Sequence, residues 1–103
     1  MRIKGKVVLV TGAARGVGLA VAKRCAAEGA TVIMTDINDT LLASQAKRVS
    51  PHAFGLDVAD EAAWQTRVAW IEETFGRLDV LFNNAAILRA GTIEQTTLSQ
   101  WRE

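Results

Sequence analysis

Three glycines, Gly12, Gly16 and Gly18, follow a short run of aliphatic residues at 7–10 and open a stretch with helical periodicity. A phosphate oxygen needs backbone N–H groups at close range, and a Cβ on such a turn would keep it away. Gly12 would let the chain leave a strand sharply, Gly16 would let a pyrophosphate approach, and Gly18 would let the helix pack closely. An ordinary glycine-containing turn is the alternative. The three-glycine frame favours a nucleotide-phosphate site at a helix N-terminus.

Asp36 is a second candidate, because it ends another β-branched run, 31–35, eighteen positions beyond Gly18. A carboxylate at the end of that strand can accept hydrogen bonds from the ribose hydroxyls of an adenine dinucleotide. It would also repel a 2′-phosphate, which favours NAD over NADP. The alternative is a solvated acid at a strand end.

The elements that must position these residues alternate between strand and helix. Apolar runs predict four strands, at 7–10, 31–35, 53–56 and 80–82. Apolar stripes predict helices from about 17 to a stop at Gly29, at 40–49, and from a cap at Asp60 to a stop at Gly76. This alternation predicts an α/β fold, a Rossmann-like parallel sheet in the order 3-2-1-4 with helices on both faces.

Length and composition predict one partial domain over residues 1–103, ending early in a further helix that begins near 97. The net charge of +1 with scattered basic residues argues against nucleic acid, and no apolar run approaches the roughly 20 residues of a membrane span. The single Cys25 indicates a cytoplasmic location and a packing role. His52 has no ligand cluster, so no metal site is expected. Trp64 is expected in the core and Trp70 as a partly exposed ring or an interface anchor.

Residues 11–18 read Thr-Gly-x-x-x-Gly-x-Gly, Asp57-Val58 follows the third strand, and 83–86 read Asn-Asn-Ala-Ala. These motifs, in this order along the whole chain, resemble the short-chain dehydrogenase/reductase family. The resemblance implies that Asp57 accepts a hydrogen bond from the adenine amino group and that Val58 touches the ring. It also implies that the asparagines lock the central sheet and that the small residues that follow let the backbone approach the cofactor's ribose. Ala86 stands where the family has glycine.

The cofactor implied by these residues is NAD. In the family a basic residue just before the second glycine, here Arg15, often favours NADP, but Asp36 lies closer to the ribose and position 37 is Ile37 rather than a basic residue. The candidate cofactor-binding residues are Gly12, Arg15, Gly16, Val17, Gly18, Asp36, Ile37, Asp57, Val58, Asn83, Ala85 and Ala86.

The resemblance implies hydride transfer between a nicotinamide and an alcohol or carbonyl, with a tyrosine general acid/base, a lysine, a serine and a further asparagine. The chain contains no tyrosine and ends before the part of the family that carries these groups, so no catalytic residue is assigned. We interpret it as the N-terminal half of an NAD-dependent enzyme, whose small alcohol or carbonyl substrate would need the other half. The alternative is a non-catalytic dinucleotide-binding or self-associating module. A bare fourth strand would favour a homo-oligomer.

Overall fold

The computed structural model describes residues 3–84 of the chain. Strands and helices alternate throughout this part, as the sequence predicts. They are β1 (Val7–Thr11), α1 (Gly16–Ala27), β2 (Thr31–Asp36), α2 (Asp39–Ala46), β3 (His52–Gly55), α3 (Glu61–Phe75) and β4 (Val80–Asn83). The further helix predicted near 97 lies outside the described residues.

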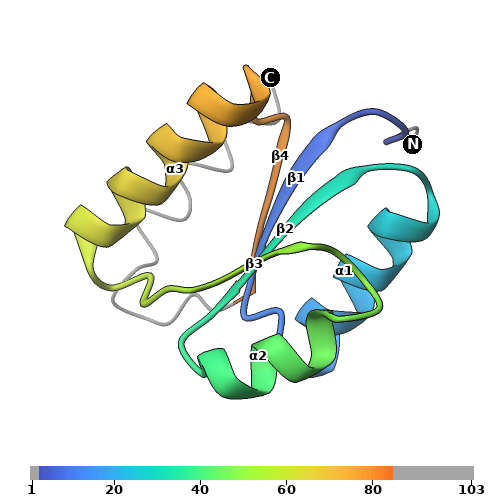
Figure 1. Ribbon diagram of the computed structural model, residues 1–103, viewed down its shortest axis with the longest axis horizontal. Helices are drawn as coiled ribbons and strands as arrows, with labels where there is room; N and C mark the ends of the chain where they lie inside the picture. The colour runs from blue at the N-terminus through green and yellow to red at the C-terminus, as the bar shows by residue number, and fades with distance from the viewer. Residues whose placement is uncertain (1–2, 85–103) are drawn as a thin grey trace.

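The four strands form one parallel sheet in the order β3-β2-β1-β4, which confirms the predicted order. β1 lies between β2 and β4, and Thr11 at its end pairs in register with Asn83. Asp36 at the end of β2 pairs with Gly55 at the end of β3. The carboxyl ends of the strands therefore meet at one edge of the sheet, where the predicted site residues follow them (Figure 1).

Helices cover both faces of the sheet, with α1 and α2 on one side and α3 on the other (Figure 1). Alternate residues of each strand point to opposite faces, and β1 shows the result. Val8 and Val10 belong to the cluster beneath α1 and α2, whereas Val7 and Leu9 belong to the cluster beneath α3. Because both faces are covered, all five residues of β1 are buried, which explains its continuous apolar run.

The helix ends follow from local hydrogen bonds. Asn38 caps α2 by accepting a hydrogen bond from the Leu41 N–H at 3.0 Å, and Asp60 caps α3 through the Ala63 N–H at 3.1 Å. Gly76 closes α3 in the left-handed region, at φ +79°. The helix predicted at 40–49 is shorter than expected. It ends at Ala46, because the next residues make a tight turn onto the Ala46 carbonyl.

The tryptophans of α3 differ in part from expectation. Trp64 packs against the α3-side core but is only half-buried. Trp70 is also half-buried, and its ring meets Phe54 edge-on with 4.8 Å between centroids. The Arg67 guanidinium lies 3.9 Å above the Phe54 ring. Trp70 thus joins α3 to the outer strand β3.

Candidate functional site

The loop between β1 and α1 turns on glycines with positive φ. Gly12 has φ +62° and Gly16 has φ +61°, a backbone conformation that residues with a side chain rarely adopt. A Cβ placed on Gly16 would meet no atom within 4 Å. The backbone at Gly16 therefore faces open space, so a ligand can approach it closely.

Gly18 is required for a different reason, because it packs against the loop itself. A Cβ on Gly18 would lie 2.1 Å from the Gly12 carbonyl oxygen and 3.0 Å from the Asn84 side-chain nitrogen. Neither the backbone carbonyl nor the first turn of α1 could stay in place against such a contact. The absent side chain thus brings the start of α1 directly against the end of β1.

The N-terminus of α1 differs from those of the other described helices. Its N-cap residue Arg15 makes no side-chain capping bond, and its first turn holds no acidic residue. By contrast, α2 and α3 each have a capping side chain and an acid, Asp39 or Glu61, in the first turn. The first N–H groups of any helix lack intrahelical partners and carry partial positive charge. The start of α1 can therefore receive an anion from outside the helix.

Asp36 is bonded to the loop that the glycines shape. One carboxylate oxygen accepts the Ala14 N–H at 3.0 Å, and the other accepts the Asn38 N–H at 2.9 Å. The Ala13 N–H bonds to the Thr35 carbonyl at 2.9 Å. This anchoring role of Asp36 was not predicted from the sequence. A carboxylate has about four acceptor positions, so these two bonds leave it able to accept a hydroxyl donor as well.

The end of β4 holds the loop from its other side. The buried Thr11 hydroxyl donates to the Asn83 side-chain oxygen at 2.7 Å. The Asn84 side-chain amide donates to the Gly12 carbonyl in a long bond of 3.4 Å. Asn84 and Thr11 were not among the predicted cofactor-binding residues, although both stand inside the quoted motifs. Ala85 and Ala86 lie outside the described residues.

Two large apolar side chains are exposed in the described part of the chain, and both border this edge of the sheet. Val17, in the first turn of α1, is 62% exposed, and Ile37, directly after β2, is 72% exposed. Arg15, at the N-cap of α1, is also exposed. Single exposed apolar residues are common in proteins, but here they flank the open glycine loop.

Asp57 and Val58 follow β3 toward the same edge, since the Leu56 N–H bonds to the Asp36 carbonyl at 3.0 Å. The Asp57 side chain is exposed, and one of its oxygens accepts the Ala59 N–H at 2.9 Å. Val58 is half-buried. The carboxylate thus stabilises the turn that leads into α3, while it stays accessible at the sheet edge.

The remaining candidates have structural surroundings. The His52 ring packs edge-on against Phe75 with 5.1 Å between centroids. Burial raises the pKa of the Cys25 thiol, and the negative charge of Glu28 raises it further, so the thiol stays protonated at neutral pH. Within residues 3–84 no group of three His, Cys, Asp or Glu side chains could hold a metal ion, and no helix is long and apolar enough to cross a membrane.

A family model and curated relatives point to one family. The model of the short chain dehydrogenase family matches residues 6–103. The chain is 44% identical to galactitol 2-dehydrogenase of Agrobacterium fabrum over 99 residues, covering 94% of this chain and 39% of that protein. It is 40% identical to meso-2,3-butanediol dehydrogenase of Serratia marcescens over 106 residues, covering 99% and 42% respectively.

The fold comparison gives the same result. A short chain dehydrogenase structure from Pseudomonas syringae, described as putative, superposes with a TM-score of 0.75 at 37% identity, covering 84% of this chain and 38% of that one. The chain spans about two fifths of the length of the relatives it matches. The family match, the parallel sheet and the glycine loop together show that this chain belongs to the short-chain dehydrogenase/reductase family.

Proposed function

We propose that this chain forms the NAD-binding part of an oxidoreductase that transfers a hydride between a nicotinamide cofactor and a small alcohol or carbonyl compound. The observation that carries the proposal is the glycine loop. Its backbone at Gly16 faces open space, and it leads into a helix whose N-terminus has neither a side-chain cap nor an acid. The relatives named above are dehydrogenases of polyhydric alcohols, which supports an alcohol substrate.

The pyrophosphate of the cofactor is assigned to the loop and the start of α1. Gly12 and Gly16 permit its approach, Gly18 keeps the helix close, and the first N–H groups of α1 donate to the phosphate oxygens. Because hydrogen bonds already hold the loop in place, little conformational entropy of this backbone is lost when the ligand binds.

The adenosine ribose is assigned to Asp36. Its carboxylate keeps acceptor capacity beyond its two backbone bonds, and its negative charge would repel a 2′-phosphate. The exposed Arg15 is a cation that could attract such a phosphate, but it lies at the N-cap of α1 rather than at the end of β2, where Asp36 lies. We therefore propose NAD as the preferred cofactor, with NADP bound more weakly.

The adenine ring is assigned to the space beside Ile37, Asp57 and Val58. Covering the exposed Ile37 would remove apolar surface from water, and Asp57 offers a carboxylate to an amino donor. Val17 would contact the cofactor from the start of α1. We propose that the backbone approaches the cofactor's second ribose closely at Asn83, Ala85 and Ala86.

The residues of this chain bind and orient the cofactor, and none of them is assigned a proton-transfer role. The nicotinamide, when bound, supplies or accepts the hydride. Family likeness implies that a tyrosine carries the proton, and the chain has none. We further propose a cytoplasmic location, because the single Cys25 leaves no disulfide within this chain, and a homo-oligomeric state.

Calorimetric titration of the full-length protein with NAD and with NADP tests the cofactor assignment. NAD should bind with the higher affinity, and binding of neither cofactor would refute the proposal. Turnover is tested separately, by following NAD reduction with galactitol and with meso-2,3-butanediol, the alcohols named for the two relatives above. A protein that binds NAD but oxidises none of these, and reduces none of the matching carbonyl compounds with NADH, would instead be a non-catalytic dinucleotide-binding module.

A further inference from the structure

A groove lies between the C-terminal halves of α1 and α2, and no residue of the glycine loop is among those that line it. It has a volume of about 640 Å³. Lys23 and the pair Ala26 and Ala27 line it from α1, while Gln45 and Arg48 line it from α2 and the turn that follows. The groove therefore belongs to neither the sheet edge nor the proposed cofactor site.

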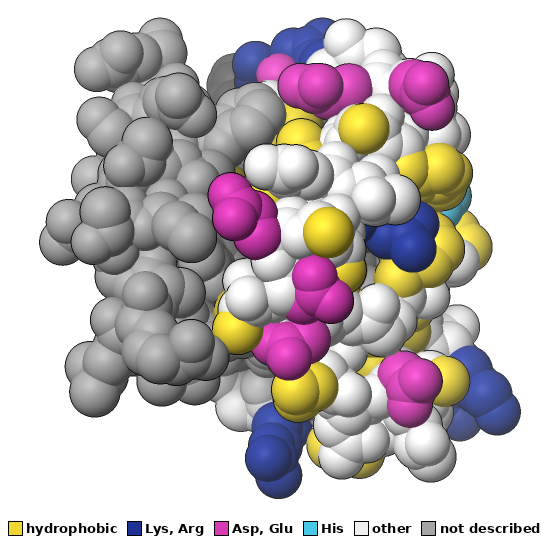
Figure 2. Space-filling model, turned by 90° about the vertical axis from the view of Figure 1, so that its left-hand side faces the viewer, with side chains coloured by type: hydrophobic (Ala, Val, Ile, Leu, Met, Phe, Trp, Pro, Cys, Tyr) yellow, Lys and Arg dark blue, Asp and Glu magenta, His cyan; other side chains and the backbone are white. Residues whose placement is uncertain are grey.

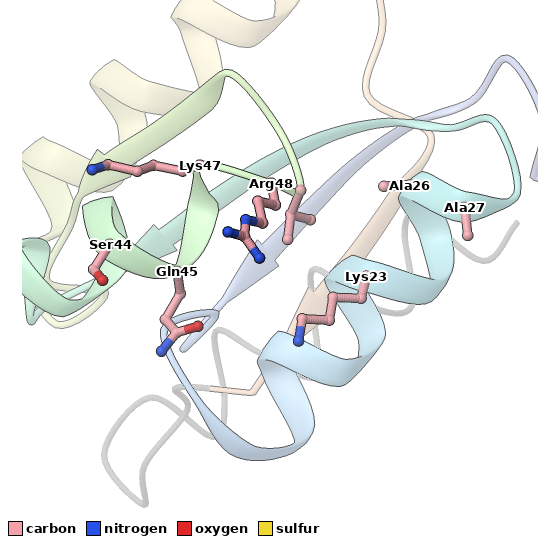
Figure 3. A pocket seen from close by; sticks show the side chains of 8 residues that line it. Lys23, Ala26, Ala27, Ser44, Gln45, Lys47 and Arg48 are labelled. Carbon is pink, nitrogen blue, oxygen red and sulfur yellow. The ribbon is translucent and has the colours of Figure 1, made fainter.

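Three polar side chains converge on this groove. Figure 3 shows the Lys23 ammonium, the Gln45 amide and the Arg48 guanidinium pointing toward the same space between the helices, whereas Lys47 points away from it. Among the described residues, none of those that line the groove is acidic. Within the described part of the chain, the ion pairs are Arg24–Glu28 and Arg77–Asp79, so neither cation of the groove is neutralised there.

Basic residues near helix C-termini often serve only to offset the negative end of the helix dipole. Here several of the last carbonyls of both helices already have backbone donors. The Glu28 and Gly29 N–H groups bond to the final turn of α1, and the Val49 and Ser50 N–H groups bond to the Ala46 carbonyl at the end of α2. The carbonyls of Arg24, Cys25, Ala26 and Ala46 therefore do not need the two cations as partners.

The surroundings of the groove favour an anion with a small apolar body. Ala26, Ala27 and Val49 provide apolar lining beside the convergent donors. The opposite side of the molecule differs in charge, since α3 carries the exposed residues Glu61, Glu72 and Glu73, and acidic side chains spread over that face (Figure 2). The groove thus lies on the face of the sheet opposite to these acidic side chains of α3.

We propose that the groove between α1 and α2 binds a small organic phosphate monoester, with the phosphate held by Lys23, Gln45 and Arg48. A phosphate monoester carries a charge of about −1.5 to −2 at neutral pH, which matches the two cations. A guanidinium can donate two parallel hydrogen bonds to phosphate oxygens, and the ammonium and amide add further donors. The organic part of the ligand lies over the alanines and Val49.

Phenyl phosphate is the probe for this site, titrated calorimetrically into the full-length protein with and without saturating NAD. Inorganic phosphate tests the anion alone, and phenol tests the apolar body alone. Phenyl phosphate should bind saturably and more tightly than either. Its affinity should not change when NAD is present, because the groove lies away from the glycine loop. Displacement by NAD, or no saturable binding, would overturn the proposal.

Substitutions locate the ligand. Lys23→Gln and Arg48→Gln should each weaken phenyl phosphate binding about tenfold, since each removes a charge-assisted hydrogen bond. Gln45→Glu should abolish binding by placing a carboxylate against the phosphate. Arg24→Gln is the matched control, because Arg24 neighbours Lys23 on α1 but pairs with Glu28 and does not line the groove.

The melting temperature of each variant shows whether the substituted side chain contributes to the stability of the fold or only to ligand binding. The groove side chains are exposed, so the three groove variants should melt within a few degrees of the parent protein. An equal loss of affinity in Arg24→Gln, or unchanged affinity in Lys23→Gln and Arg48→Gln, would contradict the site. Because these titrations do not need NAD binding, failure of the proposed cofactor function would leave them interpretable.

Discussion

The Asp36 carboxylate and the Ala14 N–H are joined by a 3.0 Å hydrogen bond, which ties the end of β2 to the glycine loop. The residue proposed to select the cofactor by its ribose therefore also holds the loop proposed to bind its phosphates. Its second oxygen accepts the Asn38 N–H at the start of α2. One side chain thus fixes the backbone on both sides of the proposed adenosine site, so cofactor choice and loop stability are linked.

Replacing Asp36 should therefore change two properties together. Asp36→Ala removes the acceptor for the ribose and for both backbone donors, so NAD affinity should fall tenfold or more and the preference over NADP should narrow. The free energy of unfolding should fall by about 1–2 kcal/mol, because two N–H groups lose their partner. Calorimetric titration with both cofactors and urea denaturation measure the two effects.

Asp36→Asn is the informative companion variant. It keeps one oxygen acceptor but turns an amide N–H₂ toward the other backbone donor, so we expect a loss of stability close to that of Asp36→Ala. If both variants still preferred NAD over NADP to the same degree, the proposal that Asp36 binds the adenosine ribose would be wrong. If the free energy of unfolding were unchanged in both variants, the proposal that Asp36 holds the glycine loop in place would be wrong.

Gly16→Ala should weaken NAD binding more than it weakens the fold. The new Cβ meets no protein atom within 4 Å, but it enters the open space assigned to the pyrophosphate. Because residue 16 has φ +61°, the alanine also adds backbone strain of about 1–2 kcal/mol. Gly5→Ala is the matched control, because Gly5 has φ +78°, an equally open Cβ position and no place in the site. Similar melting temperatures with a much larger loss of NAD affinity in Gly16→Ala are expected. Equal NAD affinities in the two variants would contradict the proposed contact between the pyrophosphate and the backbone at Gly16.

Gly18→Ala should instead destabilise the protein directly. Its Cβ would lie 2.1 Å from the Gly12 carbonyl oxygen, so α1 or the loop must move. Overpacking of this kind costs about 1–3 kcal/mol or more, and the displaced loop should lose cofactor affinity as well. Urea denaturation measures the first effect. A variant as stable as the parent would show that α1 can shift at no cost.

The order of the sheet and its two covered faces could be predicted because they follow from hydrophobic periodicity and from the handedness of parallel connections. The capping roles of Asp60 and Gly76 were predictable for the same reason, since they depend on neighbours within one turn. The bond from Ala14 to Asp36 joins residues 22 positions apart and depends on the exact path of the loop. Asn84 was expected to lock the sheet, but its contact with the Gly12 carbonyl was not predicted, because it spans 72 positions. Residue types along the chain do not specify such contacts.

The bond between Thr11 and Asn83 should couple β1 to β4. The hydroxyl is fully buried and donates to the amide oxygen at 2.7 Å, at the point where the two strands pair in register. A double-mutant cycle with Thr11→Val and Asn83→Ala should give a coupling free energy of about 0.5–1.5 kcal/mol. Additive losses of unfolding free energy would mean that the bond contributes nothing by itself.

Asp79 should make the stability of the protein depend on acid pH. Partial burial alone would raise the pKa of this carboxyl, but hydrogen bonds from Arg77 and from the Val7 N–H, with the charges of Arg77 and Lys6, outweigh it and hold the pKa below its usual value. Its contribution to stability is therefore complete above the unfolded pKa of about 4. It is lost as the pH falls through the lower folded value, because protonation breaks the link between β1 and the start of β4.

Asp79→Asn should accordingly be less stable than the parent protein at neutral pH, and the difference should shrink as the pH is lowered below about 4. Urea denaturation at stepped pH values gives the free energy of unfolding for each protein. Glu73→Gln removes one exposed negative charge from α3 and controls for net charge. A parallel pH dependence in the parent and Asp79→Asn would show that this carboxylate titrates alike in the folded and unfolded chains, and the pairing with Arg77 and Val7 would then add nothing to the fold.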